Sequence, residues 1–153
     1  MIHFRPLSPD DFPMLQDWLQ RPHIREWWDD GDDTLDKVAA HYSRSPEETK
    51  RFLAVVDGVD AGYFQYSRLG PTEIGVDQFL ADGGALSQGL GARCLTEFVT
   101  LIDGREAPDT ISLDPHQSNR RAIRCYEKCG FVHDPAQSDA DIYFMLKVRE
   151  EAI

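Results

Sequence analysis

The chain has 153 residues, close to the usual size of one domain and too short for two separate hydrophobic cores. Hydrophobic residues make up 41% of it and aromatic residues 10%, which excludes a disordered chain because this composition can bury a core. The formal net charge of −11 argues against nucleic acid or an anionic membrane as a partner, since both need basic patches, and favours a small cationic ligand.

The N-terminal residues lack the basic and apolar regions of a signal peptide, and no stretch approaches the roughly 20 apolar residues of a membrane span. We therefore expect a cytoplasmic protein with one domain over residues 1–153. Cys94, Cys125 and Cys129 are odd in number and show no Cys-x-x-Cys spacing. This pattern predicts neither a disulfide framework nor a metal site.

The first third of the chain predicts a strand followed by two helices. The strand covers residues 2–5, a helix begins at residues 8–11, and a second helix follows Asp33 or Thr34 with an acidic first turn that suits the helix dipole. Apolar residues recur at helical spacing in both helices: Phe12, Leu15, Trp18 and Leu19 in the first, and Leu35, Val38, Ala39 and Tyr42 in the second.

A meander of strands is expected next. Residues 52–56 and 61–66 flank the turn pair Asp57-Gly58, which predicts a β-hairpin with a two-residue loop. A third strand is expected at residues 74–79.

The last part of the chain alternates helices and strands. A long amphipathic helix comes first, with an apolar face of Leu90, Cys94, Leu95, Phe98, Leu101 and Ile102. A strand at 110–113, a helix from about Ser118 to Cys129 and a strand near 142–148 follow. The whole order predicts an α/β chain in which α+β elements give way to a βαβα pattern.

A glycine-containing segment, residues 87–92, joins a strand to the long helix. Gly89 and Gly91 let the main chain approach a ligand closely, and the free N–H groups of a helix N-terminus suit a pyrophosphate. Alone, the pattern is more often a structural turn. It has no Walker lysine, and Cys94 occupies the last glycine position of the dinucleotide-binding pattern.

A second segment at residues 119–131 reads Asn-x-x-Ala-x-x-x-Tyr-Glu-Lys-x-Gly-Phe. Together the two segments resemble the cofactor side of N-acetyltransferases of the GNAT superfamily. The resemblance implies a single domain with a mixed, mostly antiparallel sheet flanked by helices, and acetyl-CoA as co-substrate. The cofactor-binding residues that it implies are Gln88, Gly89, Leu90, Gly91, Ala92, Asn119 and Tyr126.

The resemblance also places the Tyr126 hydroxyl near the acetyl-CoA sulfur. Attack by an amine on a thioester expels a thiolate that an adjacent O–H can protonate, so Tyr126 is the candidate general acid. Without the motif, a tyrosine on an amphipathic helix is more often a core residue. Gly130 is expected in the left-handed conformation at the helix end. Leu86 departs from the Gln or Arg usual in the family, which puts one pyrophosphate contact in doubt.

Residues 18–28, 75–78 and 114–115 are similar to one branch of the superfamily, the aminoglycoside 6′-N-acetyltransferases. This resemblance implies a polycationic sugar whose amine is held by acidic residues at Asp77 and Asp114. The chemistry agrees, because an ammonium must lose a proton to a carboxylate, or to water held by one, before it attacks. Asp114 is therefore also a catalytic candidate. For both residues the alternative is a turn position at a strand end.

Trp27 and Trp28 are expected at the substrate site, because aromatic faces pack on sugar rings and attract ammonium groups. At most one of two adjacent residues can point fully into a core, and a hydrophobic plug is the alternative for the pair. The acidic stretch around them is either a solvated loop or attracts cations. Its members are Glu26, Asp29, Asp30, Asp32, Asp33 and Asp36.

Two other functions remain open. Acyltransferases for hydroxylysine-type siderophore precursors share the Trp-Leu-x-x-Pro-His start, but they are expected to carry His and Asp in the middle strands, and residues 42–115 contain no His. A non-catalytic acetyl-CoA-binding module is the other alternative, and the intact Tyr126 and aspartates argue against it. The chain is expected to be a monomer or a homodimer.

Overall fold

The computed structural model describes residues 1–28, 31–44, 48–84 and 88–149. Asp29, Asp30, Leu86 and Ser87 of the sequence-based interpretation lie outside these ranges. The strands are β1 (Ile2–Pro6), β2 (Thr49–Val56), β3 (Val59–Gly70), β4 (Glu73–Leu80), β5 (Thr110–Leu113), β6 (Val132–His133) and β7 (Met145–Val148). The helices are α1 (Phe12–Leu19), α2 (Pro22–Arg25), α3 (Leu35–Tyr42), α4 (Leu90–Glu106) and α5 (Arg120–Lys128), with 3-10 turns η1 (Pro9–Asp11) and η3 (Pro135–Gln137).

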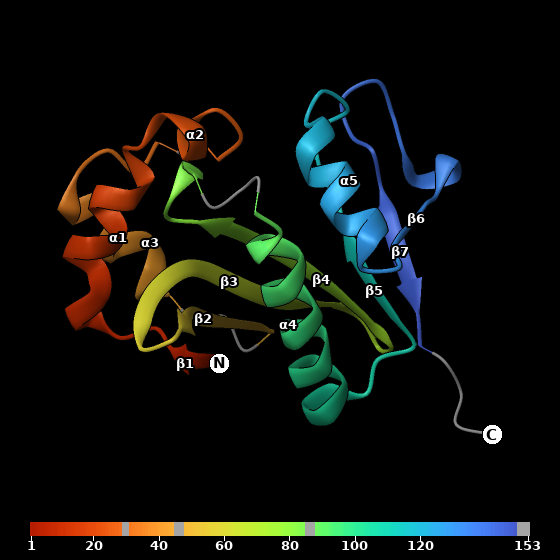
Figure 1. Cartoon of the computed structure of the whole chain (residues 1–153), viewed down its shortest axis with the longest axis horizontal. Coiled ribbons are helices and arrows are strands. Elements are labelled where there is room, and N and C mark those ends of the chain that lie inside the picture. Colours follow the sequence, from red (N-terminus) through yellow and green to blue (C-terminus); the bar gives the residue numbers. More distant parts are fainter. Residues whose placement is uncertain (29–30, 45–47, 85–87, 150–153) are drawn as a thin grey trace.

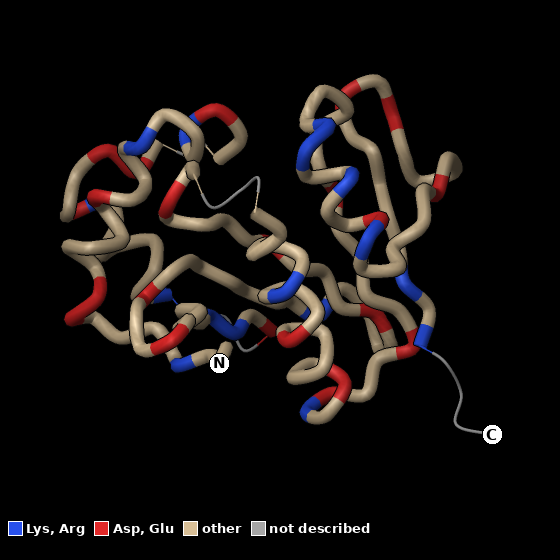
Figure 2. Tube along the Cα trace, in the orientation of Figure 1, with Lys and Arg blue, Asp and Glu red and all other residues tan. Residues whose placement is uncertain are grey.

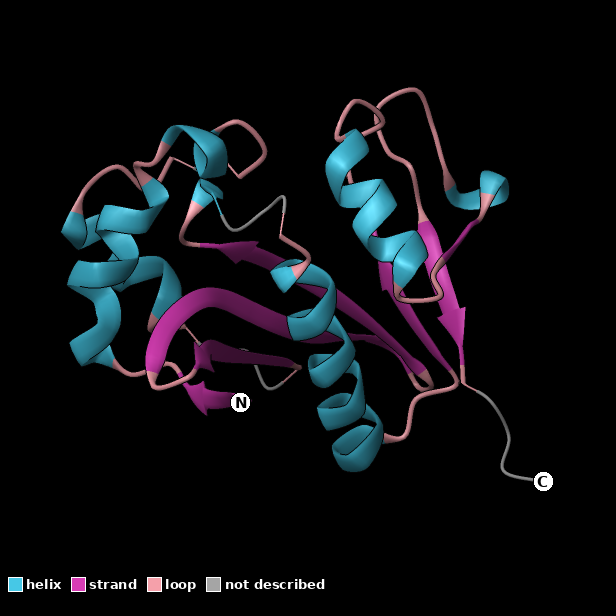
Figure 3. Ribbon diagram, in the orientation of Figure 1, coloured by secondary structure: helices cyan, strands magenta, loops and turns pink. Residues whose placement is uncertain are grey.

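The strands form one seven-stranded sheet in the order β1-β2-β3-β4-β5-β7-β6. Every neighbouring pair is antiparallel except β4 and β5, which run parallel. Helices lie on both sides of the sheet (Figures 1 and 3). The predicted mixed, mostly antiparallel sheet flanked by helices is therefore confirmed.

Strand alternation divides the core into two layers. Phe52 and Phe64 face one side, where both pack on Phe98 of α4. Leu53 and Tyr63, one position away on the same strands, belong to the cluster formed with α1 and α3. The predicted stripe of α1 is fully part of this second layer, since Phe12, Leu15, Trp18 and Leu19 are all buried.

The β2–β3 hairpin forms as predicted. Asp57 and Gly58 have φ values of 50° and 84°, the left-handed conformations that a two-residue turn of this kind needs. Gly130 likewise has a φ of 90° after α5, as expected.

Three local expectations need correction. Leu35 is 46% exposed, so the buried stripe of α3 starts one turn later, at Val38. The last strand starts at Met145 rather than near Ile142. The Asp139 carboxylate accepts the Asp141 and Ile142 amides at 2.8 Å each, and Ile142 keeps only an isolated bridge to His116. α2 and β6 have four and two residues and were not predicted, since neither is long enough to show a period.

The parallel pair β4–β5 is short. Only Glu73 to Gly75 pair with Thr110 to Ser112, after which β4 continues for five residues without β5 beside it. The two strands therefore separate toward their carboxyl ends, where α4 and α5 begin. Within the described ranges, no helix has both the length and the apolar character needed to cross a membrane.

Candidate active site

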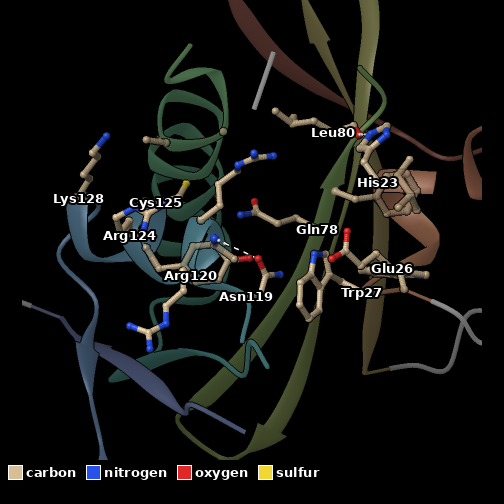
Figure 4. Close-up of a pocket in the computed structure, with 18 of the residues that line it drawn as sticks. His23, Glu26, Trp27, Gln78, Leu80, Asn119, Arg120, Arg124, Cys125 and Lys128 are labelled. Atoms are coloured by element: carbon tan, nitrogen blue, oxygen red, sulfur yellow. Dashed lines mark hydrogen bonds between the residues drawn. The ribbon is translucent and has the colours of Figure 1, made fainter. Parts of the chain in front are cut away.

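A cavity of about 630 Å³ opens where β4 and β5 separate. The end of β4, the first turn of α4, the length of α5 and the α2 region all contribute to its lining (Figure 4). It therefore lies between two walls that are far apart in the sequence. Of the predicted site residues, the lining includes Trp27, Trp28, Gly89, Gly91, Ala92, Asn119 and Tyr126.

The first wall is the N-terminus of α4. Gly89 has a φ of 77°, and the first helical hydrogen bond runs from the Arg93 amide to the Gly89 carbonyl at 3.2 Å. The preceding amides, from Leu90 to Ala92, have no helical acceptor and are available at the helix end. Gln88 and Leu90 belong to the same turn but are not part of the cavity lining.

The second wall is α5, whose exposed face is basic. Arg120, Arg124 and Lys128 recur every fourth residue, and together with Arg121 they line the cavity (Figures 2 and 4). This basic wall, in a chain of net charge −11, fits a ligand with several phosphates. The sequence interpretation missed these cations, although their helical spacing was a signal that could have found them.

Asn119 has a structural task at the start of this wall. Its side-chain oxygen accepts the Ala122 amide at 3.3 Å and caps α5. The same residue lines the cavity, so capping and ligand contact are compatible.

Tyr126 reaches the cavity from α5, opposite Gln78 of β4. Burial raises the pKa of the Tyr126 hydroxyl, the Gln78 amide lowers it, and the charges of Cys125, Asp77 and Asp114 raise it further. Among the described residues, the Oε1 atom of Gln78 is buried without a hydrogen-bond partner. A buried acceptor of this kind suits a ligand donor.

The two aspartates lie beside this tyrosine rather than in the lining itself. Burial raises the pKa of Asp77, while a 3.1 Å hydrogen bond from Gln65 Nε2 to its Oδ2 lowers it. Asp114 is exposed at the surface, yet the protein atoms around its carboxyl raise its pKa, and the Asp77 charge adds to this. Asp77, Asp114 and Tyr126 are thus close enough to influence one another.

The adjacent tryptophans point in different directions. Trp28 packs inward, with its ring 5.1 Å from Phe79 and its Nε1 donating to the Tyr42 hydroxyl at 3.3 Å. Trp27 is 43% exposed and lines the cavity, and its ring centroid lies 5.8 Å from that of His116. One ring therefore belongs to the core layer, and the other offers a face to a ligand.

Two more residues of the α2 region line the cavity, His23 and Glu26. Glu26 was named only as part of the acidic stretch, and His23, whose Nε2 lies 2.9 Å from the Leu80 carbonyl, was not predicted as a site residue. This contact joins α2 to the end of β4. All three cysteines are free, and the Cys129 thiol donates to the Ala92 carbonyl at 3.4 Å, which fastens α5 to α4.

Residues 8–138 match the family described as Acetyltransferase (GNAT) domain. The chain belongs to the GNAT acetyltransferase family. Its motifs, its fold and this match agree, so the enzyme class predicted from the sequence, an acetyl-CoA-dependent N-acetyltransferase, is confirmed.

Similar proteins extend the comparison across the whole chain. Aminoglycoside N(6')-acetyltransferase type 1 of Klebsiella pneumoniae is 33% identical over 168 residues, covering 97% of this GNAT chain and 84% of the relative. The structure of aminoglycoside acetyltransferase AAC(6')-Ib with coenzyme A has a TM-score of 0.87 at 32% identity, covering 97% of this chain and 95% of that one. The complex of AAC(6')-Ib with ribostamycin and coenzyme A has a TM-score of 0.88 at 31% identity, covering 97% and 93%.

Proposed function

We propose that this GNAT acetyltransferase transfers the acetyl group of acetyl-CoA to the 6′-amino group of an aminoglycoside-like cationic substrate. Transfer occurs by direct attack of the amine in a ternary complex. One observation carries the proposal: Tyr126 lines a cavity whose α5 wall is basic, and Asp77 and Asp114 lie close enough for their charges to act on its hydroxyl. The similarity to aminoglycoside 6′-acetyltransferases supports the choice of amine.

The cofactor side is formed by α4 and α5. The amides of Gly91 and Ala92 at the start of α4 and the basic face of α5 would hold phosphate groups, while Gln78 offers a buried acceptor. Acetyl-CoA supplies the acetyl group as an activated thioester. We assign residues 1–153 to one catalytic unit, working in the cytoplasm as a monomer or homodimer.

The amine side is formed by the aspartates and Trp27. Asp77 holds the substrate ammonium by charge and hydrogen bonding. Asp114, whose pKa is raised by partial burial and by Asp77, accepts or relays the proton that the amine must lose. The exposed face of Trp27 covers a sugar ring.

Tyr126 serves the leaving group. Its hydroxyl is protonated at neutral pH, as that of an ordinary tyrosine is, so that the O–H can donate to the departing sulfur. Burial and the neighbouring charges raise its pKa further, which disfavours the tyrosinate form in the site.

The test is acetyl-CoA consumption with a panel of amines, followed by location of the acetyl group by mass spectrometry. An aminoglycoside with a 6′-amine is compared with a matched one that carries a 6′-hydroxyl instead, and with spermidine and hydroxylysine. We expect acetylation of the 6′-amine and at least about a tenfold preference over the other substrates. A preference for spermidine or hydroxylysine would remove the aminoglycoside assignment while leaving the acetyltransferase assignment in place.

A further inference from the structure

Three polar side chains form a row across β2, β3 and β4. The strand register pairs Arg51 with Gln65 and Gln65 with Asp77. Because directly paired residues share a face, all three project toward the sheet face that packs against α1 and α3. Only the last of them has a function in the site described above.

The orientation of the Gln65 amide follows from its neighbours. Arg51 Nη1 and the Tyr63 hydroxyl both donate to Gln65 Oε1, at 2.8 and 2.6 Å. An amide group turned the other way would place N–H groups against these two donors and an oxygen against the Asp77 carboxylate. The Nε2 group must therefore face Asp77, to which it donates at 3.1 Å.

The donors that set this orientation are themselves held. Tyr63 is fully buried, and Arg51 Nη1 also donates to its hydroxyl at 2.8 Å. The Arg51 guanidinium lies 5.1 Å from the centre of the Tyr42 ring and donates to the Arg44 carbonyl at 3.3 Å. The row is thus anchored at the end farthest from the cavity.

We propose that Gln65 is a positioning residue of the acetyl transfer: it holds Oδ2 of Asp77 in one orientation and thereby directs the other oxygen to the substrate ammonium. This inference rests on the proposed function of Asp77. Arg51 and Tyr63 act through Gln65, since they determine which end of its amide faces the carboxylate.

The charge of Asp77 depends on the same contact. Burial opposes the ionised form of Asp77 and so raises its pKa, while the Asp77 charge in turn raises the pKa of Asp114 and, together with Asp114, that of Tyr126. Arg51 is separated from Asp77 by the Gln65 side chain. The Gln65 N–H group is therefore the contact that lowers the pKa of Asp77 against burial.

The variant that reverses the contact with Asp77 is Gln65→Glu. A glutamate still accepts from Arg51 and Tyr63, but it turns a carboxylate oxygen instead of an N–H toward Asp77, so the melting temperature should fall at neutral pH and recover on acidification as one of the two carboxyls takes up a proton. We expect kcat/KM at neutral pH to fall about tenfold or more, and the acidic limb of its pH profile to move upward by about one unit. The same substrate amine is used with every variant, so a shift of the acidic limb between variants reports a changed pKa in the enzyme.

Two further variants complete the experiment. Gln65→Met removes the same N–H group without adding charge and should shift the limb in the same direction. Ser67→Ala is the matched control, because Ser67 lies on the same face of β3 and its hydroxyl bonds Thr49 at 2.9 Å, away from Asp77. It should keep wild-type kinetics.

A double-mutant cycle with Asp77→Asn decides whether Gln65 acts through the carboxylate. We expect Gln65→Glu to change kcat/KM by less than about twofold once Asp77 is Asn. A full loss in that background, or an unshifted pH profile in both Gln65 variants, overturns the positioning role alone. Wild-type activity of Asp77→Asn itself overturns both this role and the proposed amine site.

Discussion

At the scale of single residues, the site is a set of acidic groups placed where charge is unfavourable. Burial opposes ionisation of Asp77, and both burial and Asp77 oppose ionisation of Asp114. Such an arrangement destabilises the empty protein and is relieved by a cationic ligand. The unfavourable ionisation of Asp77 and Asp114 leads to testable effects of single substitutions.

Replacing either aspartate by Asn keeps the size of the side chain and removes its charge. We expect each change to reduce kcat/KM by about 1.5–3 kcal/mol, the scale of a hydrogen bond to a charged group. The roles proposed above put the loss mainly on KM for Asp77 and mainly on kcat for Asp114. Steady-state kinetics at several pH values measure this split, and unchanged acetyl-CoA affinity is the control.

Asp77→Asn should also raise the melting temperature, because it removes a charge that burial disfavours. A carboxyl whose pKa is raised in the folded state stabilises the protein when protonated, and this contribution is lost as pH rises through the raised value. The variant should therefore melt a few degrees above wild type at neutral pH. The difference should shrink on acidification, and a constant difference across pH would contradict the assignment.

Tyr126→Phe removes the hydroxyl and keeps the ring. We expect kcat to fall by about 10²-fold or more, with acetyl-CoA binding retained. Pre-steady-state measurements establish that chemistry limits the rate. An unchanged kcat under that condition would make Tyr126 a packing residue.

At the scale of elements, the sequence predicts the helices and turns whose formation depends on residues close to one another along the chain. The apolar stripe of α1 and the Asp57-Gly58 turn are local patterns, and both form as expected. Asp77, Asp114 and Tyr126 were proposed from short sequence motifs, each read within one element and its flanking turn. Gln65 was not, because its importance arises from the register of three strands and from two donors that no local pattern connects to it.

The basic face of α5 offers a test at this scale. Arg124→Glu reverses one charge on the cavity wall and should weaken acetyl-CoA binding about tenfold, through a lost attraction and an added repulsion. The effect should decrease as ionic strength rises. The matched control is Arg149→Glu, because Arg149 lies after β7 and pairs with Asp109 at 3.8 Å outside the cavity. Calorimetric titration of both variants provides the comparison.

At the scale of the whole molecule, one cavity separates two kinds of charge. The overall charge of −11 favours approach of a polycation, while the cations that could hold phosphates are concentrated along α5. The net charge by itself favours a cationic substrate, and it gives no sign of the local cations that suit a phosphate-bearing cofactor. The separation of β4 from β5 opens the cavity in which the proposed substrate and the cofactor would meet.

The short joint between β4 and β5 also bears on how the chain folds. Strands β1 to β4 lie next to one another in sheet order, whereas β5 to β7 meet them through the three residue pairs of β4 and β5, the packing of α4 on α5 and the hydrophobic cluster around α4. The C-terminal part can therefore open as a unit at a lower free energy than the rest of the sheet. A ligand that touches α4 and α5 together raises the free energy of that partial opening, so the bound enzyme unfolds as one cooperative unit.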